Sequence, residues 1–477
     1  MNTKMALSAF LFCGYASFAA DIEFLNKDKS GDIMSETAWG RAVPTVDAAQ
    51  FTGNSGTSFC ACTNGTLGGL TIAIGSPLAF NMDGKKIAMN GPINPGAYKR
   101  TLAFNGGTWD FKAVADRGES CMPYGAYGDR KANSLTWDAC TFTNVVGFYM
   151  GYGGSTTEGH WTLKNGSCLH VAGACEPVFN SPGTVDINVN SGSSFLIENG
   201  LTLARASAAT ATSTFNVTVR VSGQDSLLDV RRLDKTACGL SVDSTYSKNV
   251  LIEASDGGKV KIGGGYAFFG VGSQSKDNVI RATGARSSVK VPDIYLGGST
   301  GGQDNRFEVL DGATASCDRF LYGGSRTVLV VSNASFSCSS FARNNGTDFQ
   351  LRFSGDCPRL SCSGYEFKSG TTLTFDLPPD GYLDETVAPF DSSEWGSGDG
   401  TEEIVVNGVE EMQKNMANLG IRTREMRLAH VPSATWVTVA ALARWNARLP
   451  KGAELYFNGG YVCLRVKANL GMILLVR

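Results

Sequence analysis

A repeated unit between Val250 and Phe367 constrains the fold of this chain more than any other feature. Its clearest copies are NVIRATGARSSVKV from Asn278, NRFEVLDGATASC from Asn305 and RTVLVVSNASFSC from Arg326. Each copy has a short alternating stretch, a small turn and a second short stretch, and a glycine-rich break precedes the next copy. The alternation has a period of two residues, which is a strand pattern and not a helix pattern.

The spacing between copies predicts a solenoid. An earlier copy, NVLIEASDGGKVKI, starts at Asn249, and successive starts lie 29, 27 and 21 residues apart. One such unit cannot bury its own apolar side, whereas stacked units bury a continuous core. Loops of varying length between stacked rungs explain the drift in spacing, which propeller blades tolerate less well. We therefore expect an all-β fold in which most of the chain forms one elongated body.

Ser-Cys pairs recur in the register of the repeat. Cys317 and Cys338 occupy matching places in two copies, and Cys362 follows a third serine. Stacked rungs would place these cysteines one above another, and neighbouring strands lie ~4.8 Å apart, within the ~4.4–6.8 Å Cα separation of a disulfide. The prediction is a cysteine stack or a disulfide. The alternative is that the thiols fill an inward position as small apolar side chains, at or near the places of Val260 and Val289 in earlier copies.

Residues 1–19 have the features of a secretory signal peptide. Lys4 supplies the positive start, Ala6 to Ala16 form an apolar run, and Ser17-Phe18-Ala19 offers small residues for cleavage after Ala19. The apolar run is shorter than the ~20 residues of a membrane-spanning helix. The alternative is a buried N-terminal strand or helix. The sequence thus predicts a secreted or cell-surface protein without a transmembrane segment after cleavage.

Export changes the interpretation of the cysteines. Of the 13 cysteines Cys13 lies in the signal segment, which leaves an even number in an oxidising setting. Sequence cannot fix the connectivity, and Cys357 is a further candidate partner for the Ser-Cys pairs. Proximity suggests Cys60 with Cys62, Cys121 with Cys140, and Cys168 with Cys175. A zinc site is disfavoured because the chain has only 3 histidines and no Cys-x-x-Cys pair, so no metal and no cofactor is predicted.

Composition narrows the class of protein. The chain has 58 glycines, 18% charged residues and 10% aromatic residues, which suits an ordered all-β extracellular protein and argues against disorder. A formal net charge of −2 gives no basic footprint for nucleic acid or for an anionic membrane.

No stretch carries a recognisable catalytic arrangement. The best local carboxylates are Asp293, Asp304, Glu308 and Asp311, and we interpret them as surface residues that pair with nearby arginines such as Arg281. The alternative is a cluster for general acid/base chemistry or for calcium. Histidine is too scarce for most catalytic triads.

The chain is expected to divide into four segments. These are a signal peptide over 1–19, an N-terminal cap and first rungs over 20–60, β-helix repeats over 61–378, and a C-terminal α+β tail or cap over 379–477. The last boundary is placed at Pro378-Pro379 because proline cannot extend a central strand.

The C-terminal segment has its own pattern. Asp391 to Glu403 is acidic and rich in glycine and serine, which predicts a linker or loop. Helices are predicted over Glu410–Leu419 and Trp436–Leu449. The turn Asn458-Gly459-Gly460 predicts a β-hairpin.

Two glycine-rich stretches, Gly118–Arg130 and Met150–Gly159, are predicted to be long loops. Loops on a rigid scaffold often carry function, and the tyrosines here could stack on sugar rings. These are Tyr124, Tyr127 and Tyr152, with Tyr149 just before the second loop. The favoured alternative is that the tyrosines pack the loops onto the rungs.

The chain resembles the right-handed parallel β-helix of autotransporter passengers and pectin-lyase-like proteins. The resemblance rests on rungs of twenty-odd residues, on strands that begin with asparagine, and on the opening segment SGDIMSETAWGRAVPTVDAAQF from Ser30. The resemblance covers about residues 40–378. It implies interior stacks of Val, Ile and Leu and a ladder of Asn249, Asn278 and Asn305, the alternative being that each asparagine only shapes its own turn. It further implies a structural or adhesin-like protein that contacts carbohydrate or cell-surface components, with a polysaccharide lyase or hydrolase as the alternative.

Overall fold

The computed structural model describes residues 22–468, except for short gaps. These gaps are 24–30, 40–41, 46–47, 54–57, 61–62, 75–76, 95–99, 118–120, 122–132, 147, 150–156, 174, 177–182, 204–214, 233, 235, 243–246, 273, 298–301, 344–346, 369 and 433. The predicted signal peptide and Tyr124, Tyr127 and Tyr152 therefore lie outside the described residues, and the Tyr149 side chain does as well.

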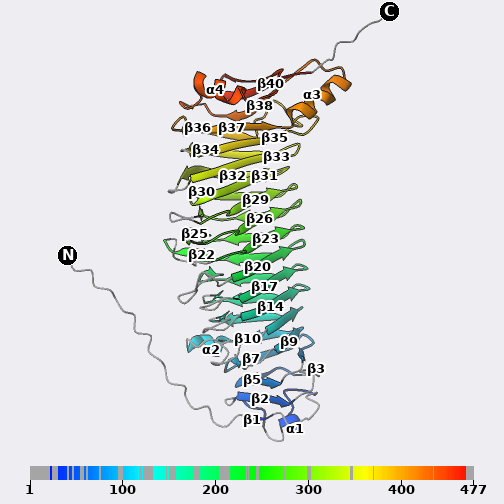
Figure 1. The fold of residues 1–477 in the computed structure, drawn as a ribbon. Coiled ribbons are helices and arrows are strands. Elements are labelled where there is room, and N and C mark those ends of the chain that lie inside the picture. The colour runs from blue at the N-terminus through cyan, green and yellow to red at the C-terminus, as the bar shows by residue number, and fades with distance from the viewer. Residues whose placement is uncertain are drawn as a thin grey trace, which may run out of the picture.

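Parallel strands stacked in rungs form an elongated body, with the N-terminal rungs at one end and the C-terminal rungs at the other (Figure 1). We call the sheet of 14 described strands the first face. Its order is β3 (Ser58–Cys60), β6 (Leu78–Asn81), β9 (Arg100–Asn105), β11 (Asn133–Asp138), β14 (Thr157–Lys164), β17 (Gly183–Asn190), β20 (Phe215–Ser222), β23 (Leu251–Ser255), β26 (Val279–Thr283), β29 (Arg306–Leu310), β31 (Ser325–Ser332), β33 (Thr347–Ser354), β35 (Thr372–Asp376) and β37 (Glu403–Asn407).

Two further stacks of parallel strands complete the rungs. The second face comprises β4 (Gly65–Leu67), β7 (Lys86–Met89), β10 (Thr108–Asp110), β12 (Thr141–Val145), β15 (Cys168–Val171), β18 (Ser194–Ile197), β21 (Leu227–Val230), β24 (Lys259–Ile262) and β27 (Ser288–Lys290). The third face comprises β13 (Phe148–Tyr149), β16 (Cys175–Glu176), β19 (Leu201–Thr202), β22 (Cys238–Val242), β25 (Tyr266–Phe269) and β28 (Asp293–Leu296).

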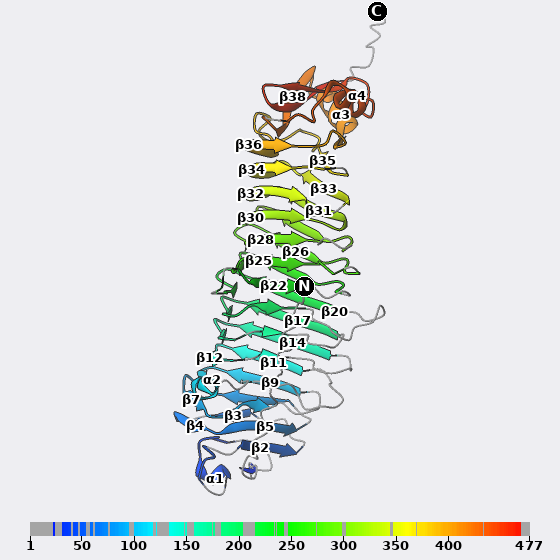
Figure 2. The same ribbon diagram turned by 90° about the vertical axis from the view of Figure 1, so that its left-hand side faces the viewer.

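The second and third faces merge in the C-terminal rungs, because both β27 and β28 pair with the single strand β30 (Thr314–Tyr322). The merged face continues through β32 (Ser335–Arg343), β34 (Arg359–Glu366) and β36 (Phe390–Ser397), which follow one another along one side in the turned view (Figure 2). At the N-terminal end a four-stranded sheet contains β1 (Ile22–Glu23), β2 (Ala48–Gly53), β5 (Gly69–Ile74) and β8 (Ile93–Asn94). Two short helices flank these rungs, α1 (Glu36–Trp39) and α2 (Lys112–Asp116).

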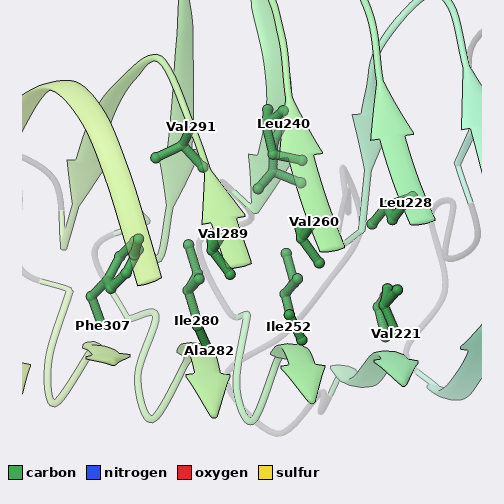
Figure 3. Packing of buried hydrophobic residues seen from close by; sticks show 14 of the residues in the cluster. Val221, Leu228, Leu240, Ile252, Val260, Ile280, Ala282, Val289, Val291 and Phe307 are labelled. Carbon is green, nitrogen blue, oxygen red and sulfur yellow. The ribbon is translucent and has the colours of Figure 1, made fainter. Parts of the chain in front are cut away.

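The core runs along the inside of the rungs. Ile252, Ile280 and Phe307 pair in register on the first face and point toward Val260 and Val289 of the second face (Figure 3). All five side chains are at most 2% exposed, and full burial of such a side chain contributes roughly 1.5–3 kcal/mol. Because the alternation has a period of two and the strands pair in register, apolar side chains of successive rungs stack on one another inside the body. The prediction of an all-β parallel β-helix is confirmed.

The asparagine ladder exists, but its members differ from those predicted. Asn278 and Asn305 are fully buried, and the Asn278 side-chain amide donates to Asn305 Oδ1 at 2.9 Å. Val250 stands in their column on the preceding rung, where its N–H donates to Asn278 Oδ1 at 3.0 Å. Asn249 lies one residue earlier, in a turn with a φ of 56°, and donates to Asn216 Oδ1 at 3.0 Å. Its inclusion in the ladder was wrong by one position of register.

Parallel stacking continues past Pro378-Pro379, where the sequence predicted its end. β36 pairs with β34 and β37 pairs with β35, both in parallel. Most of the stretch from Asp391 to Glu403, predicted to be a linker or loop, therefore belongs to a strand of the last rung. Pro378 and Pro379 lie between strands and interrupt no ladder, since β35 ends at Asp376.

A small α+β cap covers the C-terminal end of the stack (Figure 1). It consists of α3 (Val409–Asn418), β38 (Thr423–His430), α4 (Val439–Asn446), β39 (Ala453–Asn458) and β40 (Tyr461–Lys467). β38 adds to β36 in parallel, and then β40 and β39 follow in antiparallel order. Both predicted helices and the predicted hairpin are present, with ends shifted by a few residues. None of the helices within the described ranges has the length and apolar character that crossing a membrane requires.

Candidate functional site

The Ser-Cys residues form one inward column near the C-terminal end. Cys317 pairs in register with Cys338, and Cys338 with Cys362, on the adjacent strands β30, β32 and β34. Their exposed fractions are 7%, 8% and 5%, and all three are free thiols. Burial raises the pKa of the Cys338 thiol, and hydrogen bonds with the Cys317 and Cys362 thiols raise it further.

The earlier rungs fill the same column with larger apolar side chains. Lys290 pairs with Ser316, which places Val291 next to Cys317. Val289 pairs with Ala315, two positions before Cys317, and Val260 pairs with Val289, so both valines lie near the cysteine column and not in it.

Two of the other suggested cysteine pairs, Cys121 with Cys140 and Cys168 with Cys175, are not bonded. Cys140, Cys168 and Cys175 are free thiols whose pKa values are raised chiefly by burial. Cys121 Sγ accepts a hydrogen bond from the Val146 N–H at 3.0 Å. The pair Cys60 and Cys62 lies outside the residues whose side chains are described.

The candidate carboxylates lie apart, and three of them, Asp293, Asp304 and Glu308, pair with arginines. On the first face Arg281 bridges two rungs, with Nε 2.7 Å from Glu308 Oε2 and Nη1 3.1 Å from Glu253 Oε2. On the third face Arg319 Nε donates to Asp293 Oδ2 at 2.8 Å. These side chains form separate ladders of alternating charge and do not share a groove.

Asp304 and Asp311 lie in turns at either end of β29. Arg326 contacts both carboxylate oxygens of Asp304 at 2.6 Å, and this hydrogen bond lowers the pKa of the Asp304 carboxyl. The Thr283 hydroxyl donates to Asp311 Oδ2 at 3.3 Å. Across the described parts of the chain, no group of three or more His, Cys, Asp and Glu side chains is arranged to hold a metal ion.

The three histidines lie on different rungs, each beside a carboxylate. His160 Nδ1 is 3.2 Å from Asp186, and His170 Nε2 is 2.9 Å from Glu198. His430 Nδ1 is 2.7 Å from Asp391, and its ring stacks on Tyr461 with centroids 4.3 Å apart.

A serine stands near one of these histidines without forming a triad. Ser361, Asp391 and His430 follow one another in a single column of the merged face. A serine nucleophile needs the imidazole between itself and the carboxylate, and here the carboxylate lies in the middle. This column has the residue types of a triad in the wrong order.

An outward-facing group on the third face was missed by the sequence interpretation. Tyr266 and Phe268 of β25 and Tyr295 of β28 are partly exposed, and we call them the aromatic cluster. The ring centroids of Phe268 and Tyr295 are 5.2 Å apart, and those of Tyr266 and Phe268 are 4.8 Å apart. The signal was available, because alternation places Tyr266, Phe268 and Tyr295 opposite the inward Ala267, Phe269 and Ile294.

A shallow groove of about 500 Å³ begins at β27 of the second face and continues along β30, β32 and β34 of the merged face. Six hydroxyl side chains from four rungs line it: Ser288, Thr314, Ser316, Ser335, Ser337 and Ser361. Lys290 and Arg359 lie among the lining residues on the lowest and highest of these rungs. Lys261 pairs in register with Lys290 on the rung below, and neither lysine has an ion-pair partner among the described residues. The groove exists because the side chains that line it on successive rungs are mostly small.

The surface thus offers flat contacts and no convergent reactive groups among the described residues. Aromatic rings, hydroxyls and unpaired lysines can bind an extended polar polymer. The candidate carboxylates are separated, and Asp293, Asp304 and Glu308 are paired with arginines. Comparison of the chain with protein-family models, with curated proteins and with solved structures finds no match.

Proposed function

We propose that this protein is an exported, rod-shaped structural protein of the adhesin type, which contacts carbohydrate chains at or near a cell surface through the side of its β-helix. The observation that carries the proposal is the aromatic cluster on the third face. Rings held on paired strands offer contact area at a low cost in conformational entropy, since each has only two side-chain torsions.

The chemistry of the cluster suits sugars. Ring hydrogens of a pyranose pack against aromatic faces, and the Tyr266 and Tyr295 hydroxyls can bond sugar hydroxyls. The hydroxyl side chains that line the groove add hydrogen-bond donors and acceptors. Each contact is shallow, so the affinity depends on many contacts along one rod.

The predicted signal peptide and the resemblance to autotransporter passengers support export and surface display. The alternative is a polysaccharide lyase or hydrolase on the same fold. That function needs two carboxylates in one groove on adjacent rungs, and the paired and separated Asp293, Asp304 and Glu308 disfavour it.

The test uses the mature chain and a panel of neutral and acidic polysaccharides, with co-sedimentation and chain shortening followed in the same tubes. We expect at least one polymer to co-sediment without shortening. The double substitution Tyr266→Ala with Tyr295→Ala should weaken that binding about tenfold, which corresponds to ~1.4 kcal/mol.

The matched control is Tyr456→Ala, which removes a partly exposed tyrosine from the cap, far from the cluster. It should leave binding unchanged, and thermal unfolding should show that all variants are folded. Shortening of any polymer would replace this proposal with the enzymatic one. Absence of binding to every polymer would leave a structural role without a carbohydrate ligand.

A further inference from the structure

We propose that the cysteine column of the exported protein holds one disulfide between adjacent rungs, always formed by Cys338, with either Cys317 or Cys362, while the third cysteine stays a thiol. This cross-link is independent of the proposed carbohydrate contact. It follows from the position of Cys338 between two cysteines on neighbouring parallel strands.

The geometry brings each neighbouring pair within bonding range. In-register strands lie ~4.8 Å apart, inside the ~4.4–6.8 Å Cα range of disulfides. The side chains share one inward column and are at least nine-tenths buried. Cys338 is the register partner of both neighbours, on the strand between them.

The same geometry excludes a bond between the outer two cysteines. Cys317 and Cys362 are two rungs apart, which is ~9.6 Å, and disulfides do not form beyond a Cα separation of ~7 Å. Every disulfide within the column therefore uses Cys338, and only one can exist at a time. Cys357 does not share the column, because its backbone N–H bonds to Asn333 Oδ1 at 3.1 Å in the turn before β34.

The chemistry requires an oxidant. A thiolate of the column attacks a small disulfide such as oxidised glutathione, and one glutathione thiol leaves. The neighbouring thiolate then attacks the mixed disulfide, and a second glutathione thiol leaves. Two cysteine thiols have lost two protons and two electrons, and one glutathione disulfide has become two thiols.

The reaction belongs to folding and not to the finished rod. In the folded column burial raises the pKa of Cys338 and excludes the oxidant, so thiolate attack there is slow. Before the last rungs close, the thiols are accessible. The bond then links residues that are 21 positions apart for Cys317 with Cys338, or 24 for Cys338 with Cys362. It restricts the unfolded conformations of the C-terminal rungs.

Peptide mapping tests this directly, because trypsin places each cysteine on its own fragment. The fragments are 307–319 for Cys317, 327–343 for Cys338, 353–359 for Cys357 and 360–368 for Cys362. The full chain is refolded in a glutathione redox buffer, denatured without reductant and alkylated with iodoacetamide, and labelled fractions are measured by mass spectrometry.

We expect Cys338 to be protected from alkylation and the protected fractions of Cys317 and Cys362 to sum to one equivalent. In Cys338→Ala both outer cysteines should become fully labelled. In Cys317→Ala, Cys338 and Cys362 should both be protected. Cys463→Ala, which changes a cysteine of the cap, is the matched control and should leave the pattern unchanged.

Three results would overturn the proposal: full labelling of Cys338 in the unreduced wild type, protection of the outer cysteines in Cys338→Ala, or a disulfide from Cys338 to Cys357. Circular dichroism verifies that each variant is folded. If Cys338→Ala does not fold, Cys338→Val replaces it, because Val291 fills the same column one rung below Cys317.

Discussion

At the scale of single residues, the inside of this β-helix tolerates polar side chains only where the next rung satisfies them. Asn278 uses its amide to reach Asn305 Oδ1 and Ser275 Oγ, and its carbonyl accepts from the Val250 N–H. Asn305 in turn donates to the Gly270 carbonyl at 3.3 Å. Each asparagine thus replaces backbone hydrogen bonds that an irregular segment between strands cannot make.

Removal of one ladder member should therefore be costly. Asn278→Ala leaves the buried Val250 N–H without its acceptor, and a buried unsatisfied group costs ~1–3 kcal/mol. It also removes the side-chain donor to Asn305 Oδ1 and Ser275 Oγ, so that Asn305 Oδ1 keeps only the Asn278 N–H at 3.4 Å. We expect a loss of about 2–4 kcal/mol in the free energy of unfolding, measured by urea denaturation.

The control is Asn249→Asp, one position outside the ladder. Asp277 and Asp304 have the same left-handed backbone at the matching place on the next rungs, with φ values of 57° and 54°. This substitution removes only the exposed hydrogen bond to Asn216 Oδ1, so it should change the free energy of unfolding by less than ~1 kcal/mol. Equal effects of the two substitutions would show that the ladder contributes nothing special.

A surface ion pair gives a prediction for pH. Arg326 lowers the pKa of the Asp304 carboxyl in the folded state, so the unfolded chain takes up a proton at a higher pH than the folded chain does. The stabilisation is complete above the unfolded value of ~3.9 and is lost as pH falls through the lowered pKa. Asp304→Asn should therefore be less stable than wild type at pH 7.

The difference between Asp304→Asn and wild type should shrink below pH 4, as followed by urea midpoints across pH. Asp256→Asn is the control, because Asp256 has the same backbone conformation with a φ of 52° and no ion-pair partner among the described residues. A gap between wild type and Asp304→Asn that stays constant down to pH 2 would refute the ion-pair explanation.

At the scale of elements, the sequence predicts strands well and register poorly. Period-two alternation and glycine breaks identify β26, β29 and β31, because stacked rungs need alternate residues inside. Alternation does not say where a strand starts relative to its neighbour, and a slip of one residue changes which side chains stack. For this reason Asn249 was placed in the ladder, and Arg326 was aligned with Asn305 although Thr327 is its neighbour in register.

The missed strand β36 has a similar cause. Its inward positions are Phe390 and Ser392, and the remaining residues from Ser393 to Ser397 are mostly exposed. From its sequence alone, a segment with so few apolar residues is predicted to be a loop. It pairs with β34 because the rung below offers an unpaired edge, which is information from tertiary structure. The aromatic cluster and the groove were missed since their members come from different rungs, and register is needed to bring them together.

At the scale of the whole molecule, stacking makes a rod whose two ends differ. The 14 strands of the first face span ~60 Å at ~4.8 Å per step, and every interior strand has its backbone paired on both sides. The last rung would present an open edge. The cap covers it: β38 pairs with β36, and the Trp445 indole N–H donates to the Glu402 carbonyl at 3.2 Å beside β37.

An open edge with unpaired backbone N–H and C=O groups and apolar side chains is a template for other chains. We therefore expect a chain ended after Asn407, which lacks the cap, to self-associate at concentrations at which the full chain does not. In sedimentation velocity, self-association appears as a sedimentation coefficient that increases with protein concentration. A chain ended after Ala468 retains β38, β39 and β40 and should sediment as the full chain does. Sedimentation of the shorter chain as a folded monomer at every concentration would mean that the last rung protects its own edge, and the cap would then need another role.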